Sequence, residues 1–150
     1  MNLELVDKTA LVSGSTKGIG FAIASRLAAE GARVIVNGRS DNAVNSALEQ
    51  VRKAVPEAKV EGFAGDLATA AATEDLLKLF PAMDILVNNL GIYEPKPFDE
   101  ISDEEWRRFF EVNVLSAVRL SRAYLPGMKE RDWGASFSSA ARARSIAPRK

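Results

Sequence analysis

The sequence contains neither cysteine nor histidine. The chain therefore has no disulfide, no thiolate nucleophile, no Ser-His-Asp arrangement and no zinc site built on Cys or His ligands, and we expect no metal site. No apolar run approaches the roughly 20 residues of a membrane span, and the N-terminus lacks the apolar core of a signal peptide. We expect a cytoplasmic protein without a membrane partner.

The chain also has no net charge, because 20 basic residues balance 20 acidic ones. This balance gives no general attraction to nucleic acid. The exception is the end of the chain, where no acid follows Asp132 and the basic residues are Arg142, Arg144, Arg149 and Lys150. We interpret this run as a solvated tail rather than as an arm that binds nucleic acid, and expect no nucleic-acid partner.

Short apolar runs alternate with segments of helical periodicity. The runs typical of buried strands are residues 8–13, 33–37, 59–63 and 85–87. Helix signals follow each run, among them a start at Ser40 or Asp41, and a capping box of Ser102 and Glu105 that opens a long helix toward Pro126. At 150 residues the chain suits one domain. The alternation predicts an α/β fold, a Rossmann-like doubly wound parallel sheet with helices on both faces.

Ligands of such sheets bind outside the carboxyl ends of the strands, so the residues after each strand are the informative ones. A glycine-rich segment follows the first strand, and its residues are Gly14, Ser15, Thr16, Lys17, Gly18, Ile19 and Gly20. Glycines here permit a tight turn, close approach of a phosphate and close helix packing, and the following helix directs its N–H groups at an anion. The segment predicts a nucleotide site, and the alternative is a plain strand–helix turn.

The residues after the second strand indicate which dinucleotide binds. A site for NAD(H) places a carboxylate there on the ribose 2′-hydroxyl. This sequence has Asn37-Gly38-Arg39-Ser40 and no acid before Asp41. Arg39 and Lys17 are both suited to a 2′-phosphate, although solvated surface cations are the plain alternative. We therefore favour NADP(H) over NAD(H) as the cofactor.

Polar residues also follow the third and fourth strands. Asp66, next to Leu67, either accepts from an adenine amino group or caps a turn. Asn88 and Asn89 either orient loops through their side-chain amides or form an ordinary turn that leads to Gly91.

These motifs, taken in order, resemble the short-chain dehydrogenase/reductase family. The glycine segment of the family appears at residues 13–20, its adenine-side acid as Asp66, its Asn-Asn-Ala-Gly as residues 88–91 and its long-helix asparagine as Asn113. Leu90 in place of alanine is a departure. The resemblance covers roughly residues 5 to 134 and implies cofactor contacts from residues 14–20, Arg39, Asp66, Leu67, Asn88 and Gly91.

The resemblance implies hydride transfer between a nicotinamide and a carbonyl or alcohol carbon. In the family a tyrosine is the general acid and base, a lysine lowers the pKa of that tyrosine, a serine orients the substrate, and the asparagine, here Asn113, supports a water relay. No Tyr-x-x-x-Lys occurs in these 150 residues, and the family's serine position falls on Ala141.

From about Gly134 the family pattern stops. Deletion of one nucleotide from codons for a family strand reproduces residues 134–143, so we expect a truncated and frameshifted reductase. We expect residues 1–134 to form an NADP(H)-binding domain, residues 135–150 to form an irregular basic tail, and the fourth strand to keep an unpaired edge. Because the partner helix of the family is missing, we do not expect the family's homo-oligomer.

Two functions from different classes remain open at this point. One is an NADP(H)-dependent oxidoreductase, similar to 3-oxoacyl reductases and inactive as this chain. The other is a non-catalytic nucleotide-binding remnant. The substrate does not follow from the sequence.

Overall fold

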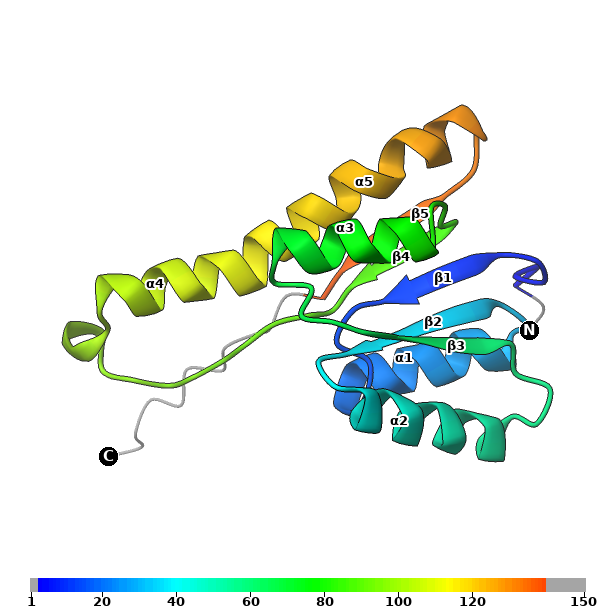
Figure 1. Ribbon diagram of the computed structural model, residues 1–150, viewed down its shortest axis with the longest axis horizontal. Helices are drawn as coiled ribbons and strands as arrows, with labels where there is room; N and C mark the ends of the chain where they lie inside the picture. The colour runs from blue at the N-terminus through cyan, green and yellow to red at the C-terminus, as the bar shows by residue number, and fades with distance from the viewer. Residues whose placement is uncertain (1–2, 140–150) are drawn as a thin grey trace, which may run out of the picture.

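A five-stranded parallel sheet forms the centre of the protein, which we describe from a computed structural model over residues 3–139. The strand order is β3-β2-β1-β4-β5 (Figure 1). The strands are β1 (Thr9–Val12), β2 (Arg33–Gly38), β3 (Val60–Ala64), β4 (Ile85–Asn88) and β5 (Ala135–Ser138). The chain starts in the middle, moves to one edge through β3 and returns to the other side of β1 with β4. This confirms the Rossmann-like α/β fold, with a reversal of strand order between β1 and β4.

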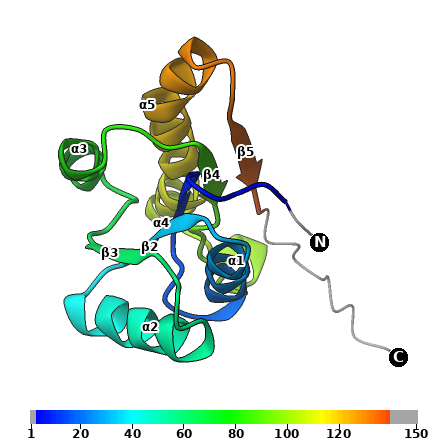
Figure 2. The same ribbon diagram turned by 90° about the vertical axis from the view of Figure 1, so that its right-hand side faces the viewer.

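Helices cover both faces of the sheet because successive strand residues point to opposite sides. On one face, α1 (Gly18–Ala29) and α2 (Asp41–Ala54) pack with Val12, Val34 and Val36. On the other face, α3 (Ala70–Leu79) and α5 (Ser116–Glu130) pack with Leu11, Ile35 and Leu86. Figures 1 and 2 show α1 and α2 together, with α3 and α5 on the opposite side. Burial on both faces explains why β1 and β2 are continuous apolar runs.

The long helix consists of α4 (Asp103–Phe110), a π turn η2 (Glu111–Leu115) and α5. The predicted capping box is confirmed, since Glu105 N donates to Ser102 Oγ and Ser102 N donates to the Glu105 carboxylate. The helix was expected to end toward Pro126, but it continues to Glu130. Pro126 cannot donate a backbone hydrogen bond inside the helix. Burial of Met128 in the core on the side of α3 and α5 offsets this loss of stability.

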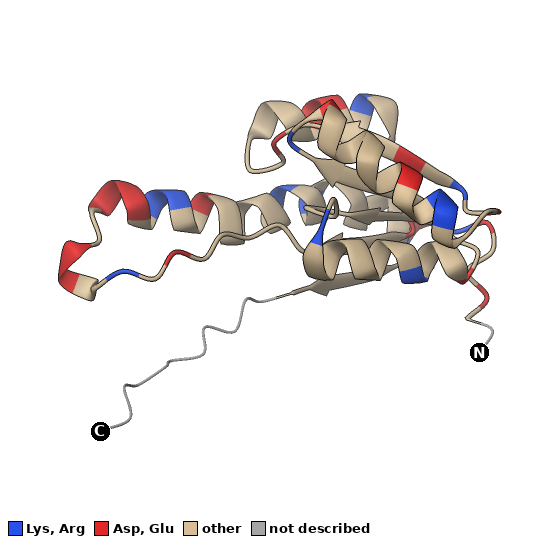
Figure 3. Cartoon of the chain, turned by 90° about the horizontal axis from the view of Figure 1, so that it is seen from below, with Lys and Arg blue, Asp and Glu red and all other residues tan. Residues whose placement is uncertain are grey.

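The helix α4 and the chain before it, including η1 (Phe98–Glu100), extend beyond the carboxyl edge of the sheet (Figure 1). Acidic residues gather around the start of α4 (Figure 3). They are Asp99, Glu100, Asp103, Glu104 and Glu105. Within residues 3–139, no helix has both the length and the apolarity of a membrane span.

The strand β5 corrects two expectations, because the irregular segment does not begin at residue 135 and β4 does not have an unpaired edge. β5 pairs in parallel with β4, with Ala135 opposite Ile85 and Ser138 opposite Asn88. The pairing depends on backbone hydrogen bonds, which do not require alternating apolar side chains. A sequence pattern detects only that alternation, so it missed this strand. The remainder of the expected tail, residues 140–150 with the position of Ala141, lies outside the described residues.

Candidate functional site

A cavity of about 510 Å³ lies at the carboxyl ends of the strands. It is lined by the segments that follow β1, β2, β3 and β4, together with two residues of the long helix. The predicted site residues on its wall are Gly14, Thr16, Lys17, Gly18, Arg39, Asp66, Leu67 and Gly91. The predicted residues outside the wall are Ser15, Ile19, Gly20, Asn88 and Asn113. The structure thus brings together most of the residues chosen from the sequence, and from all four segments.

The start of α1 is open and carries no cap from any side chain of the described residues. Gly18 has φ of +60°, and a Cβ added there would meet no atom within 4 Å, so the space beside it is open. α2, α3 and α4 begin with capping side chains from Ser40, Thr69 and Ser102. Among residues 3–139, no side chain caps α1. The first N–H groups of α1 therefore remain available to a ligand in the cavity.

Asn89 fixes the loop after β1 to the loop after β4. Its Nδ2 donates to Ser13 O at 3.1 Å and to Gly14 O at 3.0 Å. A Cβ at Gly20 would collide with Asn89 Nδ2 and approach Gly14 O to 2.5 Å, so only glycine fits against this contact. The interpretation of the asparagine pair as loop-orienting amides is confirmed for Asn89.

Asn37 is a structural organiser that the sequence analysis missed. Its Oδ1 accepts from Gly14 N at 3.0 Å, and its Nδ2 donates to Phe63 O and Gly65 O at 3.1 and 3.0 Å. One buried side chain of β2 thus joins the segment after β1 to the end of β3. The available signal was an asparagine at the end of an otherwise apolar strand, where an unpaired amide is costly.

Ser15 is buried, and its hydroxyl serves the same network. It donates to Val12 O at 2.6 Å and accepts from Asn37 N at 2.9 Å. Ile19, by contrast, is 71 % exposed on the first turn of α1. The side chains of Ser15 and Ile19 therefore do not form the cavity wall.

Asp66 caps a turn and also lines the cavity. Its Oδ1 accepts from Ala68 N at 3.1 Å, and its carbonyl oxygen accepts from Thr69 N at 2.9 Å. The turn-capping interpretation is confirmed. Contact with an adenine amino group stays a prediction, which the position of Asp66 beside Leu67 on the wall permits.

Two cations lie on the wall next to the open helix start. Lys17 precedes Gly18, and Arg39 follows Gly38 at the end of β2. Both residues are exposed. The nearest following acid, Asp41, is the first residue of α2 and does not line the cavity. The wall at the end of β2 is therefore positive.

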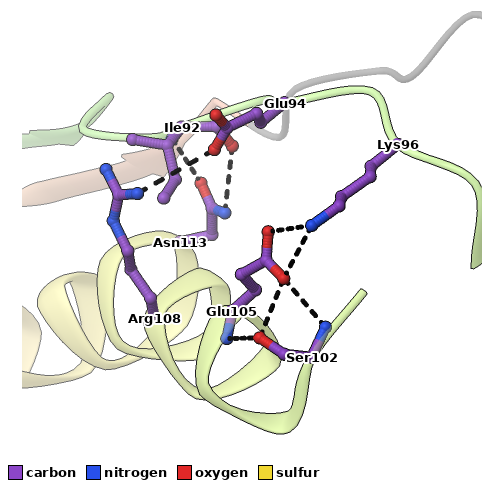
Figure 4. Close-up of polar contacts among 7 residues, drawn as sticks. All are labelled: Ile92, Glu94, Lys96, Ser102, Glu105, Arg108 and Asn113. Atoms are coloured by element: carbon purple, nitrogen blue, oxygen red, sulfur yellow. Dashed lines mark hydrogen bonds and ion pairs between the residues drawn. The ribbon is translucent and has the colours of Figure 1, made fainter. Parts of the chain in front are cut away.

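Asn88 and Asn113 lie outside the cavity wall. Asn88 is buried in β4 and its Nδ2 donates to Ser121 Oγ of α5 at 3.4 Å, while its Oδ1 accepts no hydrogen bond from the described residues. Asn113, in the π turn, bonds to the backbone of Ile92 (Figure 4). Asn113 therefore reaches the site through Ile92, which lines the cavity. Its place in a water relay stays a prediction.

Arg108 and Val112 are wall residues that the sequence analysis did not single out. They are four positions apart, so they share one face of the long helix. The signal that was available is their position next to the predicted site residue Asn113. Val112 directly precedes Asn113, and Arg108 lies one helical turn before Val112, on the same face of the helix.

Comparisons with known proteins agree with this geometry. The family model of the short chain dehydrogenases matches residues 8–141. YvaG, an uncharacterized oxidoreductase of Bacillus subtilis, is 52 % identical over 134 residues, which cover 89 % of this chain and 51 % of the relative. D-beta-hydroxybutyrate dehydrogenase of Cupriavidus necator is 41 % identical over 131 residues, which cover 85 % of this chain and 50 % of the relative.

A solved structure shows the same fold. L-sorbose reductase of Gluconobacter frateurii, in complex with NADPH and L-sorbose, superposes with a TM-score of 0.82 at 34 % identity, over 92 % of this chain and 54 % of that chain. The chain spans about half the length of the curated relatives that it matches. The family model covers nearly all of the described sheet and helices, and this chain belongs to the short-chain dehydrogenase family of oxidoreductases.

Proposed function

We propose that the cavity binds NADP(H) and that residues 1–134 are the cofactor-binding part of an NADP(H)-dependent oxidoreductase. The observation that carries this proposal is the placement of Lys17 and Arg39 on one wall, beside the open space at Gly18. Two cations next to a helix N-terminus favour a ligand with several phosphates. The absence of a carboxylate from the wall at the end of β2 favours a 2′-phosphate over a 2′-hydroxyl.

The residues present fit such a ligand. The start of α1 offers N–H groups that no described side chain caps, and the space above Gly18 is open to a phosphate. Arg39 presents a planar set of donors that suits a phosphate better than the point charge of Lys17 does. Asp66 offers a carboxylate for an adenine amino group. When bound, the cofactor would donate a hydride to a carbonyl carbon as NADPH, or accept one from an alcohol carbon as NADP⁺.

The reaction class of the whole protein is a second part of the proposal. Relatives include D-beta-hydroxybutyrate dehydrogenase and the 3-oxoacyl-[acyl-carrier-protein] reductase of Escherichia coli, the latter 36 % identical over 138 residues. Both names describe chemistry at the third carbon of an acyl chain. We propose reduction of a 3-oxoacyl group as the reaction to test first.

An alternative function is nucleotide binding without turnover by these 150 residues. Neither tyrosine of the chain lines the cavity. Tyr124 is buried in the second face of the core, where its hydroxyl donates to Phe80 O at 2.9 Å, and burial raises its pKa. Tyr93 is exposed, and the residue four positions later is Pro97. Within residues 3–139 no tyrosine is placed to move a proton in the cavity, which favours binding alone for this polypeptide.

Titration of the purified chain with NADPH and NADH tests the cofactor. We expect NADPH to bind at least about ten-fold more tightly, since the 2′-phosphate gains charge-assisted hydrogen bonds. Arg39→Asp should reverse the order through repulsion of the 2′-phosphate. Arg122→Asp, at an exposed arginine of α5 outside the wall, is the matched control and should keep the parent's ratio. Equal affinities of the parent for the two nucleotides contradict the proposal.

A further inference from the structure

We infer that Arg108 is a further phosphate-binding residue of this cavity, with Glu94 as an internal counter-ion that competes with the ligand for it. The inference rests on the proposed function, because it requires an anionic nucleotide in the cavity. It assigns a ligand contact to the long helix, whereas the other proposed phosphate contacts come from segments that follow the strands.

A strap, residues 92–96, runs beside the long helix and holds a counter-ion next to Arg108. Alternate strap residues meet the helix at three points (Figure 4). They are the hydrogen bonds of Ile92 with Asn113, the ion pair of Glu94 with Arg108 and the ion pair of Lys96 with Glu105. Such alternation is typical of extended backbone, in which every second residue faces the same side. Glu94 is thereby held next to Arg108, which lines the cavity, while Glu94 itself is not a wall residue.

Of two adjacent arginines on α4, only one faces the cavity. Arg108 lines the wall together with Val112, one turn further along the helix. Arg107 does not line it, and its guanidinium lies 4.0 Å from a carboxylate oxygen of Asp103. The helix therefore separates two identical side chains into a cavity residue and a surface residue.

The ion pair that holds Arg108 is loose. Its nitrogen lies 3.8 Å from a Glu94 oxygen, and the two side chains are 61 % and 64 % exposed. The next tie along the strap, between Lys96 and Glu105, is 2.9 Å long with side chains 37 % and 31 % exposed. A guanidinium has five N–H donors, so one long contact leaves most of them free for a second anion. Arg108 can thus bind a phosphate without breaking a tight internal bond.

The charge of the cavity wall supports the same conclusion. Its charged residues are the cations Lys17, Arg39 and Arg108 and the single acid Asp66. A dinucleotide carries a diphosphate, and NADPH carries a 2′-phosphate in addition, so this excess of positive charge matches either group. Which phosphate Arg108 contacts is decided by comparing nucleotides with and without the 2′-phosphate.

The test is a titration of Arg108→Gln and Arg107→Gln with NADPH, NADH and adenosine at low ionic strength. Both variants lose one positive charge from neighbouring positions of one helix, so they control for net charge. We expect Arg108→Gln to weaken NADPH binding about three- to five-fold, the range for a partly exposed charge pair, and Arg107→Gln to change it little. A loss for both dinucleotides assigns the diphosphate, and a loss for NADPH alone assigns the 2′-phosphate. Binding of adenosine should not change.

A second variant tests the competition. Glu94→Gln frees Arg108 and should tighten NADPH binding about two-fold, and this gain should vanish when Arg108→Gln is present as well. Both effects should shrink at high salt because exposed charges are screened. Melting temperatures of the variants verify that each is folded.

Three outcomes overturn the inference. One is equal binding by Arg108→Gln and the parent, in a protein whose NADPH binding still depends on Arg39. Another is an equal loss in the Arg107 and Arg108 variants, which reports net charge only. The third is a loss for adenosine as large as for NADPH, which reports a structural role. If the parent binds neither NADPH nor NADH, the proposed function fails together with the inference.

Discussion

The side chain of Asn113 and the backbone of Ile92 exchange two hydrogen bonds. Ile92 N donates to Asn113 Oδ1 at 2.9 Å, and Asn113 Nδ2 donates to Ile92 O at 3.1 Å. Asn113 lies in the π turn between α4 and α5, and Ile92 lies on the cavity wall. A side chain of the long helix thus pairs with the backbone of the segment after β4 much as a neighbouring strand would.

Removal of this side chain should loosen the wall of the cavity. We expect Asn113→Ala to lower the free energy of unfolding by about 0.5–1.5 kcal/mol, the net value of hydrogen bonds of this kind. It should also weaken NADPH binding, since Ile92 loses its anchor. Urea denaturation and calorimetric titration measure the two effects. The control is Val114→Ala, at an exposed neighbour in the same turn, and equal behaviour of the two variants contradicts the anchoring role.

Catalysis by these 150 residues alone should not be detectable. We expect no consumption of NADPH with a 3-oxoacyl thioester above the decay of the cofactor without protein. The physical reason is that general acid–base help is worth about 10²–10⁴-fold, and neither tyrosine lines the cavity. A family member such as the Cupriavidus necator dehydrogenase serves as the positive control of the assay with its own substrate. Protein-dependent turnover that Asn113→Ala abolishes contradicts this prediction.

Elements whose signals are local could be predicted from the sequence. The buried strands β1 and β2 are apolar runs between turn residues, and the capping box needs only Ser102 and Glu105, three positions apart. The glycine segment is likewise recognisable, because the positions of its glycines are set locally by the tight turn after β1 and by the start of α1. Half of the predicted wall residues, namely Gly14, Thr16, Lys17 and Gly18, lie in this segment.

What could not be predicted depends on contacts between distant segments. β5 has little apolar alternation, and it forms because the edge of β4 offers backbone partners. Asn37 has partners in two separate segments, after β1 and at the end of β3, which no local pattern reveals. Arg108 and Val112 belong to the site only because the long helix passes over the carboxyl edge of the sheet.

The capping box should make stability depend on acid pH. Hydrogen bonds from Lys96, and from the backbone and hydroxyl of Ser102, lower the pKa of Glu105 to about 2. Since the pKa is lower in the folded than in the unfolded chain, the ionised carboxylate stabilises the fold above about pH 4.5. That contribution is lost as the pH falls from about 5 to about 2.

Thermal unfolding between pH 6 and pH 2 measures this dependence. We expect Glu105→Gln to reduce the loss of stability on acidification relative to the parent. Glu104→Gln, at the preceding exposed carboxylate in the same helical turn, is the matched control and should follow the parent's curve. Parallel pH curves for Glu105→Gln and the parent contradict the assignment.

The pairing of β5 makes an alternating pattern of amide exchange. In a parallel ladder the N–H and C=O groups of one residue point to the same neighbour, and the direction alternates along the strand. The amides of Ala135 and Ser139 donate to carbonyl oxygens on the β4 side, at 2.9 and 3.0 Å. Phe137 shares their direction, whereas Ser136 and Ser138 face the edge of the sheet that has no neighbour within residues 3–139.

We therefore expect slow amide exchange at Ala135 and Phe137 and fast exchange at Ser136 and Ser138, measured by NMR. Central β2 provides the control, because it is paired on both sides and its amides should be protected without alternation. Uniformly fast exchange from Ala135 onward means that the segment does not pair, as its composition had suggested. Uniform protection instead means that a second strand covers the outer edge, from another copy of the chain or from residues beyond Ser139. A strand that is paired on one side only protects alternate amides, so either uniform pattern contradicts the assignment of β5 as an edge strand.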